Sequence, residues 1–162
     1  AIVMSDVKNF APIVENVATG ILFCQGENCS AGSRLIVHES IKDRLLDELK
    51  PVFESWTVGD PLERSTRIGA MIEEDHLAKV LSYIETGRSE GAKVALGGNR
   101  VLAETGGSFV EPTIFDGVSN TMKIAREEIF GPVLSVISFK DEAEAVRIAN
   151  DTNYGLAASL YT

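Results

Sequence analysis

The feature of this sequence that most constrains its fold is the alternation of short apolar, β-branched runs with longer segments of helical periodicity. The strongest run is Val133–Phe139 (VLSVISF), and a shorter one occupies Arg34–His38. Apolar residues at intervals of three and four predict a helix directly after each run, from Glu39 to Trp56 and from Asp141 to Ala149. Parallel strands need a helical crossover to return the chain, so this order predicts a three-layer α/β fold with a largely parallel sheet and flanking helices.

Three further helical segments are expected. Apolar periodicity predicts a helix from Asp6 to Phe23, capped by its first residue or by Ser5. A second helix is expected from Glu73 to about Glu90, where a glycine follows and ends it. A third, short helical piece is expected over Met122–Glu128.

Shorter extended segments complete the pattern. Lys93–Leu96 is expected to form a strand, and residues 97–107 a polar, glycine-rich loop. In FVEPTIF at 109–115, Pro112 cannot donate to a ladder, which predicts an edge or irregular strand. The chain opens on AIVM and closes on SLYT, and both are expected to be strands of a sheet that belongs to a longer polypeptide.

Charge and composition argue against several classes of partner. The formal net charge of −9 would repel a phosphate backbone, so no nucleic acid partner is expected. No apolar run approaches the roughly 18 residues of a spanning helix, and the chain opens without a basic leader, so we expect no membrane partner and a cytoplasmic location. The two cysteines are too few for a disulfide framework and the two histidines lack zinc-site spacing, so no metal is expected.

Cys29 has the clearest potential for chemistry. It lies in LFCQGENCSAGSR, where a predicted helix ends, Gly26 permits a tight turn, and the small residues 30–32 leave space around the thiol. An accessible thiol can act as a nucleophile, although on this pattern alone a cysteine is more often a small buried hydrophobe. That second role is the one expected for Cys24, at the end of the helix.

The segment Leu22–Ser33 resembles the active-site cysteine signature of the aldehyde dehydrogenase superfamily, with Gly26, Glu27 and Cys29 at the matching positions. The sequence FCQGENCSAGSR in this region is most similar to that of the aminoaldehyde-oxidising branch, which includes enzymes for γ-glutamyl-γ-aminobutyraldehyde and betaine aldehyde. The resemblance covers essentially the whole chain, because four more motifs follow in the family's order and spacing: VGDP at 58–61, FVEPTIF at 109–115, REEIFGPV at 126–133 and NDTNYGLAAS at 150–159.

The resemblance implies an enzyme that oxidises an aldehyde substrate to a carboxylic acid with NAD or NADP as cofactor. The Cys29 thiolate attacks the aldehyde carbon, the thiohemiacetal passes a hydride to the nicotinamide, and water hydrolyses the resulting thioester. Glu128 matches the family's ligand for the nicotinamide ribose hydroxyls, and Phe130 matches an aromatic residue that packs near the nicotinamide. Without the resemblance, Glu127 and Glu128 would be interpreted as an exposed helix end and Phe130 as core.

The resemblance also implies that residues 1–162 are part of a catalytic domain, with the cofactor-binding domain and the oligomerisation segment outside this chain. The glycine pairs at 97–98 and 106–107 do not form the G-x-G-x-x-G fingerprint. The family's oxyanion Asn and general-base Glu lie upstream of its cysteine, so neither is assigned here. We therefore expect an inactive segment of a larger enzyme, which is itself a homodimer or homotetramer.

Other interpretations stay open at this point. His76 and Lys79 share a helix face that in similar enzymes approaches the cofactor with a Gln and a Lys, but a solvated face explains them almost as well. An acylable cysteine is also compatible with thiol esterase activity. A third possibility is a non-catalytic interaction module that binds partners by strand addition.

Overall fold

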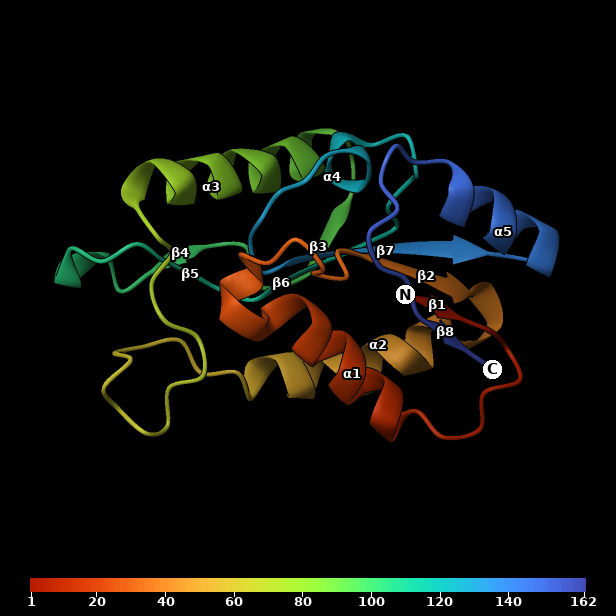
Figure 1. Ribbon diagram of the computed structural model, residues 1–162, viewed down its shortest axis with the longest axis horizontal. Coiled ribbons are helices and arrows are strands. Elements are labelled where there is room, and N and C mark those ends of the chain that lie inside the picture. The colour runs from red at the N-terminus through yellow and green to blue at the C-terminus, as the bar shows by residue number, and fades with distance from the viewer.

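The computed structural model describes all residues from 1 to 162 and shows one mixed sheet between two layers of helices (Figure 1). The sheet contains β1 (Ile2–Val3), β2 (Arg34–His38), β3 (Lys93–Leu96), β6 (Thr113–Asp116), β7 (Val133–Phe139) and β8 (Leu160–Tyr161). The strand order is β3-β6-β7-β2-β1-β8, and every pair is parallel except β3 with β6. The predicted α/β fold with a largely parallel sheet is therefore confirmed.

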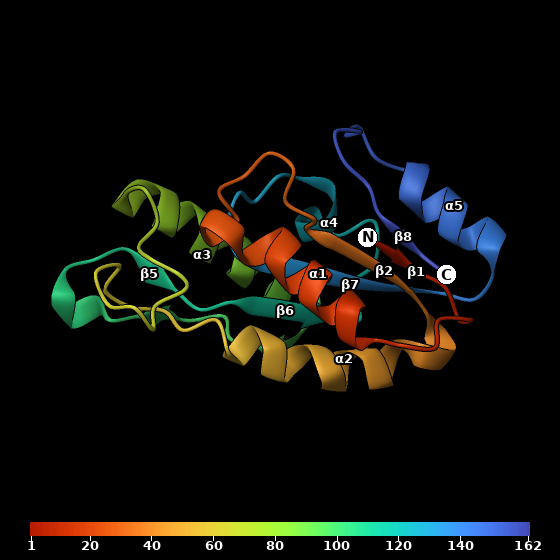
Figure 2. The ribbon, with the colours of Figure 1, turned by 60° about the horizontal axis from the view of Figure 1, so that its bottom comes forward.

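The helices cover both faces of this sheet (Figures 1 and 2). They are α1 (Ala11–Leu22), α2 (Glu39–Glu54), α3 (Glu74–Ser89), α4 (Lys123–Arg126) and α5 (Glu142–Asn150). Leu35 and Val37 of β2 are buried in one core with α1 and α2, whereas Ile36 is buried in a second core with α3, α4 and α5. Burial on both faces explains why β7 is a nearly continuous apolar run.

Most predicted elements are present, with shifts at their ends. The predicted helix start at Asp6 is wrong, because α1 begins at Ala11 with Phe10 at its N-cap position and Pro12 in its first turn. A proline fits there because the first turn needs no N–H from it. The predicted helix over 122–128 is too long, since α4 ends at Arg126 and the next residue is already extended.

Pro112 interrupts the extended segment at residues 109–115, as its position in the sequence predicts. It separates β6 from β5 (Phe109–Val110), which pairs only with β4 (Arg100–Val101), so the irregular strand is confirmed. β6 itself is not an edge strand, since it lies between β3 and β7. Since the ladder starts after the proline, with the Thr113 N–H donating to the carbonyl of Pro132, no ladder hydrogen bond is lost.

The loop after α1 packs against the segment that leads from α4 into β7, and the two lie side by side in Figure 2. Cys24, Gln25 and Gly26 have consecutive φ angles of 50°, 58° and 73°. A Cβ added to Gly26 would overlap the carbonyl oxygen of Gly131, and one added to Gly131 would lie 2.7 Å from Cγ2 of Val80 in α3. Gly26 thus allows the backbones of the loop and the segment to meet, and Gly131 leaves room for the Val80 side chain of α3.

We expect Gly26→Ala to destabilise the protein by at least about 2 kcal/mol, because the new methyl group overlaps a backbone carbonyl and the φ angle is left-handed. Gly20→Ala is the matched control. Gly20 lies in α1 with no atom within 4 Å of an added Cβ, so this change should be neutral or stabilise by up to ~1 kcal/mol. Urea denaturation of both variants measures the difference, and equal midpoints would contradict the close packing of the two loops.

Candidate active site

Cys29, Glu128 and Phe130 all line one cleft of about 650 Å³. They come from two loops, one leading into β2 and the other into β7. The residues just before β1 and β8, Ala1 and Ser159, line the same cleft. The cleft therefore lies at the amino-terminal edge of four neighbouring parallel strands, and the fold brings together the residues that the sequence singles out.

The loop around Cys29 is held by a short polar turn. The Asn28 Oδ1 accepts hydrogen bonds from the backbone N–H and the hydroxyl of Ser30, both at 3.1 Å. The Cys29 Sγ is exposed and lies 3.9 Å from the same oxygen. The backbone N–H of Cys29 donates to no acceptor in the chain, so both the thiol and this N–H are available to a bound molecule.

Cys24 is exposed, and the prediction that it is a buried hydrophobe is wrong. The last apolar residue that α1 buries is Leu22, at 0% exposure. Phe23, next along the chain, is already 56% exposed, and Cys24 has a positive φ angle that turns the chain away from the core. Helical periodicity cannot predict this, because the helix has ended.

The two adjacent carboxylates at the start of the second loop have different partners. Glu127 accepts a hydrogen bond of 2.7 Å from the Tyr83 hydroxyl and lies 3.8 Å from the Lys123 ammonium. Glu128 has no hydrogen bond or ion pair within the chain, although it lines the same cleft. Of the two, only Glu128 keeps all of its acceptor capacity for a ligand.

Phe130 is half-buried and adopts a left-handed conformation, with a φ angle of 62°. Its carbonyl oxygen lies 2.6 Å from the His76 Nε2, and the two rings meet edge to face at 5.9 Å. A non-glycine residue in this region costs of order 1–3 kcal/mol and persists only where its surroundings fix it. The His76 contact is part of that support.

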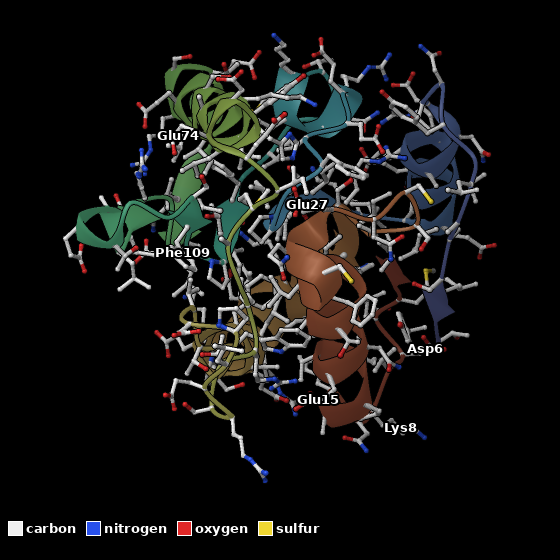
Figure 3. The ribbon with its side chains drawn as sticks, turned by 60° about the vertical axis from the view of Figure 1, so that its left-hand side comes forward. Asp6, Lys8, Glu15, Glu27, Glu74 and Phe109 are labelled. Atoms are coloured by element: carbon white, nitrogen blue, oxygen red, sulfur yellow. The ribbon has the colours of Figure 1, made fainter.

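Glu27 connects the cysteine loop to α3 and lies at the end of α1 in Figure 3. Its Oε1 accepts from the backbone N–H of Ile72 at 3.1 Å and lies 3.7 Å from the His76 Nε2. The side chains of Glu27 and His76 are each only 13% exposed. Lys79, the other candidate on this helix, is exposed and 6.0 Å from the Tyr83 ring, so it does not share the surroundings of His76.

A second polar network lies at the end of α5, just before the residues from 152 to 159 that form one wall of the cleft. Arg34 donates to the last carbonyls of α5, those of residues 148 and 149, both at 3.1 Å, and to Asn120 at 2.8 Å. Burial and the nearby Arg126 lower the pKa of Arg34. Hydrogen bonds from Arg126 and Asn120 lower the pKa of Asp151, at the end of the same helix. Sequence reasoning missed this network, because its members are far apart in the chain.

The chain has no group of three His, Cys, Asp or Glu side chains that is arranged to hold a metal ion. None of its helices combines the length and the apolar character needed to cross a membrane.

A family comparison matches residues 1–162 to the aldehyde dehydrogenase family. The chain belongs to that family. It is 47% identical over 162 residues to the aminoacetaldehyde dehydrogenase of Pseudomonas aeruginosa, a match that covers 100% of this chain and 32% of that protein. This similarity confirms the predicted family and agrees with the predicted resemblance to its aminoaldehyde branch.

Two solved structures of aldehyde dehydrogenases have the same fold over 99% of this chain. The enzyme KauB of Pseudomonas aeruginosa matches with a TM-score of 0.97 and 56% identity. The indole-3-acetaldehyde dehydrogenase of P. syringae, solved in complex with NAD+, matches with a TM-score of 0.97 and 50% identity. The chain spans about a third, 32%, of the length of each of these relatives.

The bond between Tyr83 and Glu127 predicts an unusual titration within this aldehyde dehydrogenase segment. The hydrogen bond to Glu127, together with partial burial, raises the pKa of Tyr83 to about 12. Ionising the phenol would remove the donor and place two negative charges together. The stability from this bond is therefore fully present below the ordinary tyrosine pKa of about 10, and it is lost as the pH rises through about 12.

We expect tyrosinate absorbance to show one of the three tyrosines ionising near pH 12, while circular dichroism reports that the protein stays folded. Tyr83→Phe should remove this late step. Tyr161→Phe, on β8, is the control and should retain it. Loss of the late step in the control alone would show that Tyr83 is not the residue held by Glu127.

Proposed function

We propose that this chain carries the nucleophile and the nicotinamide-facing wall of an NAD-dependent aldehyde dehydrogenase that oxidises an aldehyde to a carboxylic acid. The observation that supports this most is the convergence of Cys29, Glu128 and Phe130 on one cleft, from two loops far apart in the sequence. The relative solved with NAD+ favours NAD as the cofactor. The similarity to an aminoacetaldehyde dehydrogenase favours an aminoaldehyde as the substrate.

Cys29 performs the first step. Its thiolate forms a bond to the aldehyde carbon, and the electron pair of the carbonyl moves to the oxygen. The free backbone N–H of Cys29 is a donor for that oxyanion, and removing one such donor typically costs about 10²- to 10³-fold in rate. The turn built by Asn28 and Ser30 keeps the thiol at the surface of the cleft.

The residues present fit the nicotinamide ribose half of the cofactor. The free carboxylate of Glu128 can accept two hydrogen bonds from a diol, and Phe130 presents an aromatic surface to the same cleft. When bound, the nicotinamide supplies the hydride acceptor that turns the thiohemiacetal on Cys29 into a thioester. Hydrolysis of that thioester by water releases the acid and restores the thiol.

We further infer that residues 1–162 form part of the catalytic domain. On this proposal the cofactor-binding domain, the oligomerisation segment, the oxyanion Asn and the general base lie elsewhere in the whole protein. The isolated segment is then inactive, and the whole protein is a cytoplasmic homodimer or homotetramer.

The test is NAD-dependent oxidation of a panel of aminoaldehydes and other aldehydes by the full-length protein. Cys29→Ala should lower kcat at least about 10³-fold, because no other group can form the thioester. Cys24→Ala is the matched control, since Cys24 is also exposed but does not line the cleft, and it should keep nearly full activity. Activity that survives Cys29→Ala, or that is lost only with Cys24→Ala, would refute the assignment.

A further inference from the structure

One face of α3 holds the segment that carries Glu128 and Phe130. Residues 76, 80 and 83 are spaced by four and three positions, so they form one stripe along the helix. Each contacts that segment: His76 at the carbonyl of Phe130, Val80 at Gly131, and Tyr83 at the carboxylate of Glu127. The short helix α4 precedes the segment and also packs on α3.

His76 contacts Phe130 twice, through a hydrogen bond to its backbone carbonyl and through an edge-to-face contact with its ring. A carbonyl oxygen can only accept, so the Nε2 of His76 must carry the hydrogen in the 2.6 Å bond to Phe130. The same nitrogen lies 3.7 Å from the carboxylate of Glu27, two residues before Cys29. His76 is therefore already engaged by the protein, and a bound cofactor would have to compete with this bond to use the same nitrogen.

Tyr83 holds the other end of the segment. Its hydroxyl donates to Glu127 at 2.7 Å, and the Lys123 ammonium lies near both partners, 3.8 Å from the carboxylate and 5.3 Å from the ring. Glu128 lies between the two attachment points and makes no hydrogen bond within the chain. Because its backbone is fixed on both sides, Glu128 loses little backbone entropy when its carboxylate binds a ligand, and only the freedom of its side chain is lost.

We propose that His76 and Tyr83 are positioning residues, which hold the segment from behind so that Glu128 and Phe130 face the nicotinamide ribose and the nicotinamide ring. This inference rests on the proposed function of the cleft. It assigns to His76 a role through Phe130 and not a direct contact with the cofactor. It also gives a role to Tyr83, whose side chain does not line the cleft.

The experiment measures the NAD+ dissociation constant of the full-length protein by calorimetry, together with KM for NAD+, kcat and the melting temperature without cofactor. His76→Ala and Tyr83→Phe should each raise the dissociation constant about tenfold, since each removes one hydrogen bond that orients a ligand-binding residue. His76→Gln should restore binding to within about twofold, because the Gln Nε2 can donate to the same carbonyl. Ser82→Ala is the control, since Ser82 is exposed and bonds only within α3.

Combined variants separate positioning from direct contact. If His76 and Tyr83 act only through the two side chains that the segment presents, adding His76→Ala or Tyr83→Phe to a protein that already carries both Glu128→Ala and Phe130→Leu should weaken binding by less than about twofold. Fully additive losses would overturn the proposal, because they indicate independent contacts with the cofactor. Unchanged NAD+ binding in His76→Ala and Tyr83→Phe would overturn it as well. So would a fall in the melting temperature of His76→Ala if His76→Gln did not restore NAD+ binding.

The same measurements distinguish this inference from the proposed function. A full-length protein that binds NAD+ but oxidises no aldehyde would refute the reaction and leave the positioning test intact. A full-length protein that binds no NAD+ would refute both.

Discussion

The backbone contact between Gly26 and Gly131 is the constraint on which the cleft depends. A Cβ on Gly26 would overlap the carbonyl oxygen of Gly131, so the two loops approach as closely as their backbones allow, whereas a Cβ on Gly131 would press on the Val80 side chain of α3. One loop carries Cys29, and the other carries Glu128 and Phe130. The distance between the Cys29 thiol and the wall proposed to face the nicotinamide thus depends on two glycines, which contribute no side chain to the cleft.

Residues with strained backbone conformations lie next to the contact between Gly26 and Gly131. Cys24, Gln25 and Phe130 are three of the four non-glycine residues with positive φ angles in the chain, and all three flank the close approach. Such residues persist only where other interactions fix them. Here the hydrogen bond of His76 fixes Phe130, and the Gln25 side chain donates to the carbonyl of Ala70 at 3.4 Å. The strain is therefore supported mainly from α3 and the chain that leads into it.

The cleft opens at the amino-terminal edge of β2 and β7, because its candidate functional residues, Cys29, Glu128 and Phe130, precede these strands. Ligands of open parallel sheets more often bind beyond the carboxyl ends of the strands. The opposite placement agrees with the absence of a dinucleotide fingerprint from the sequence. Arg34 bonds to two carbonyls near the end of α5, and most of the residues from 152 to 159, which follow that helix, line the cleft.

The sequence alone determined the class of fold, most helices and strands, the family and the candidate residues, because periodicity and motifs are local properties of the chain. It misplaced the start of α1 and the exposure of Cys24, and it left open whether the strand at Pro112 was an edge strand or an irregular one, since these depend on which neighbours the fold supplies. Only the tertiary structure decided that Glu127 is bound by Tyr83 while Glu128 is free, and that His76 holds Phe130. The physical reason is that hydrogen bonds between distant segments follow from packing, which no local pattern encodes.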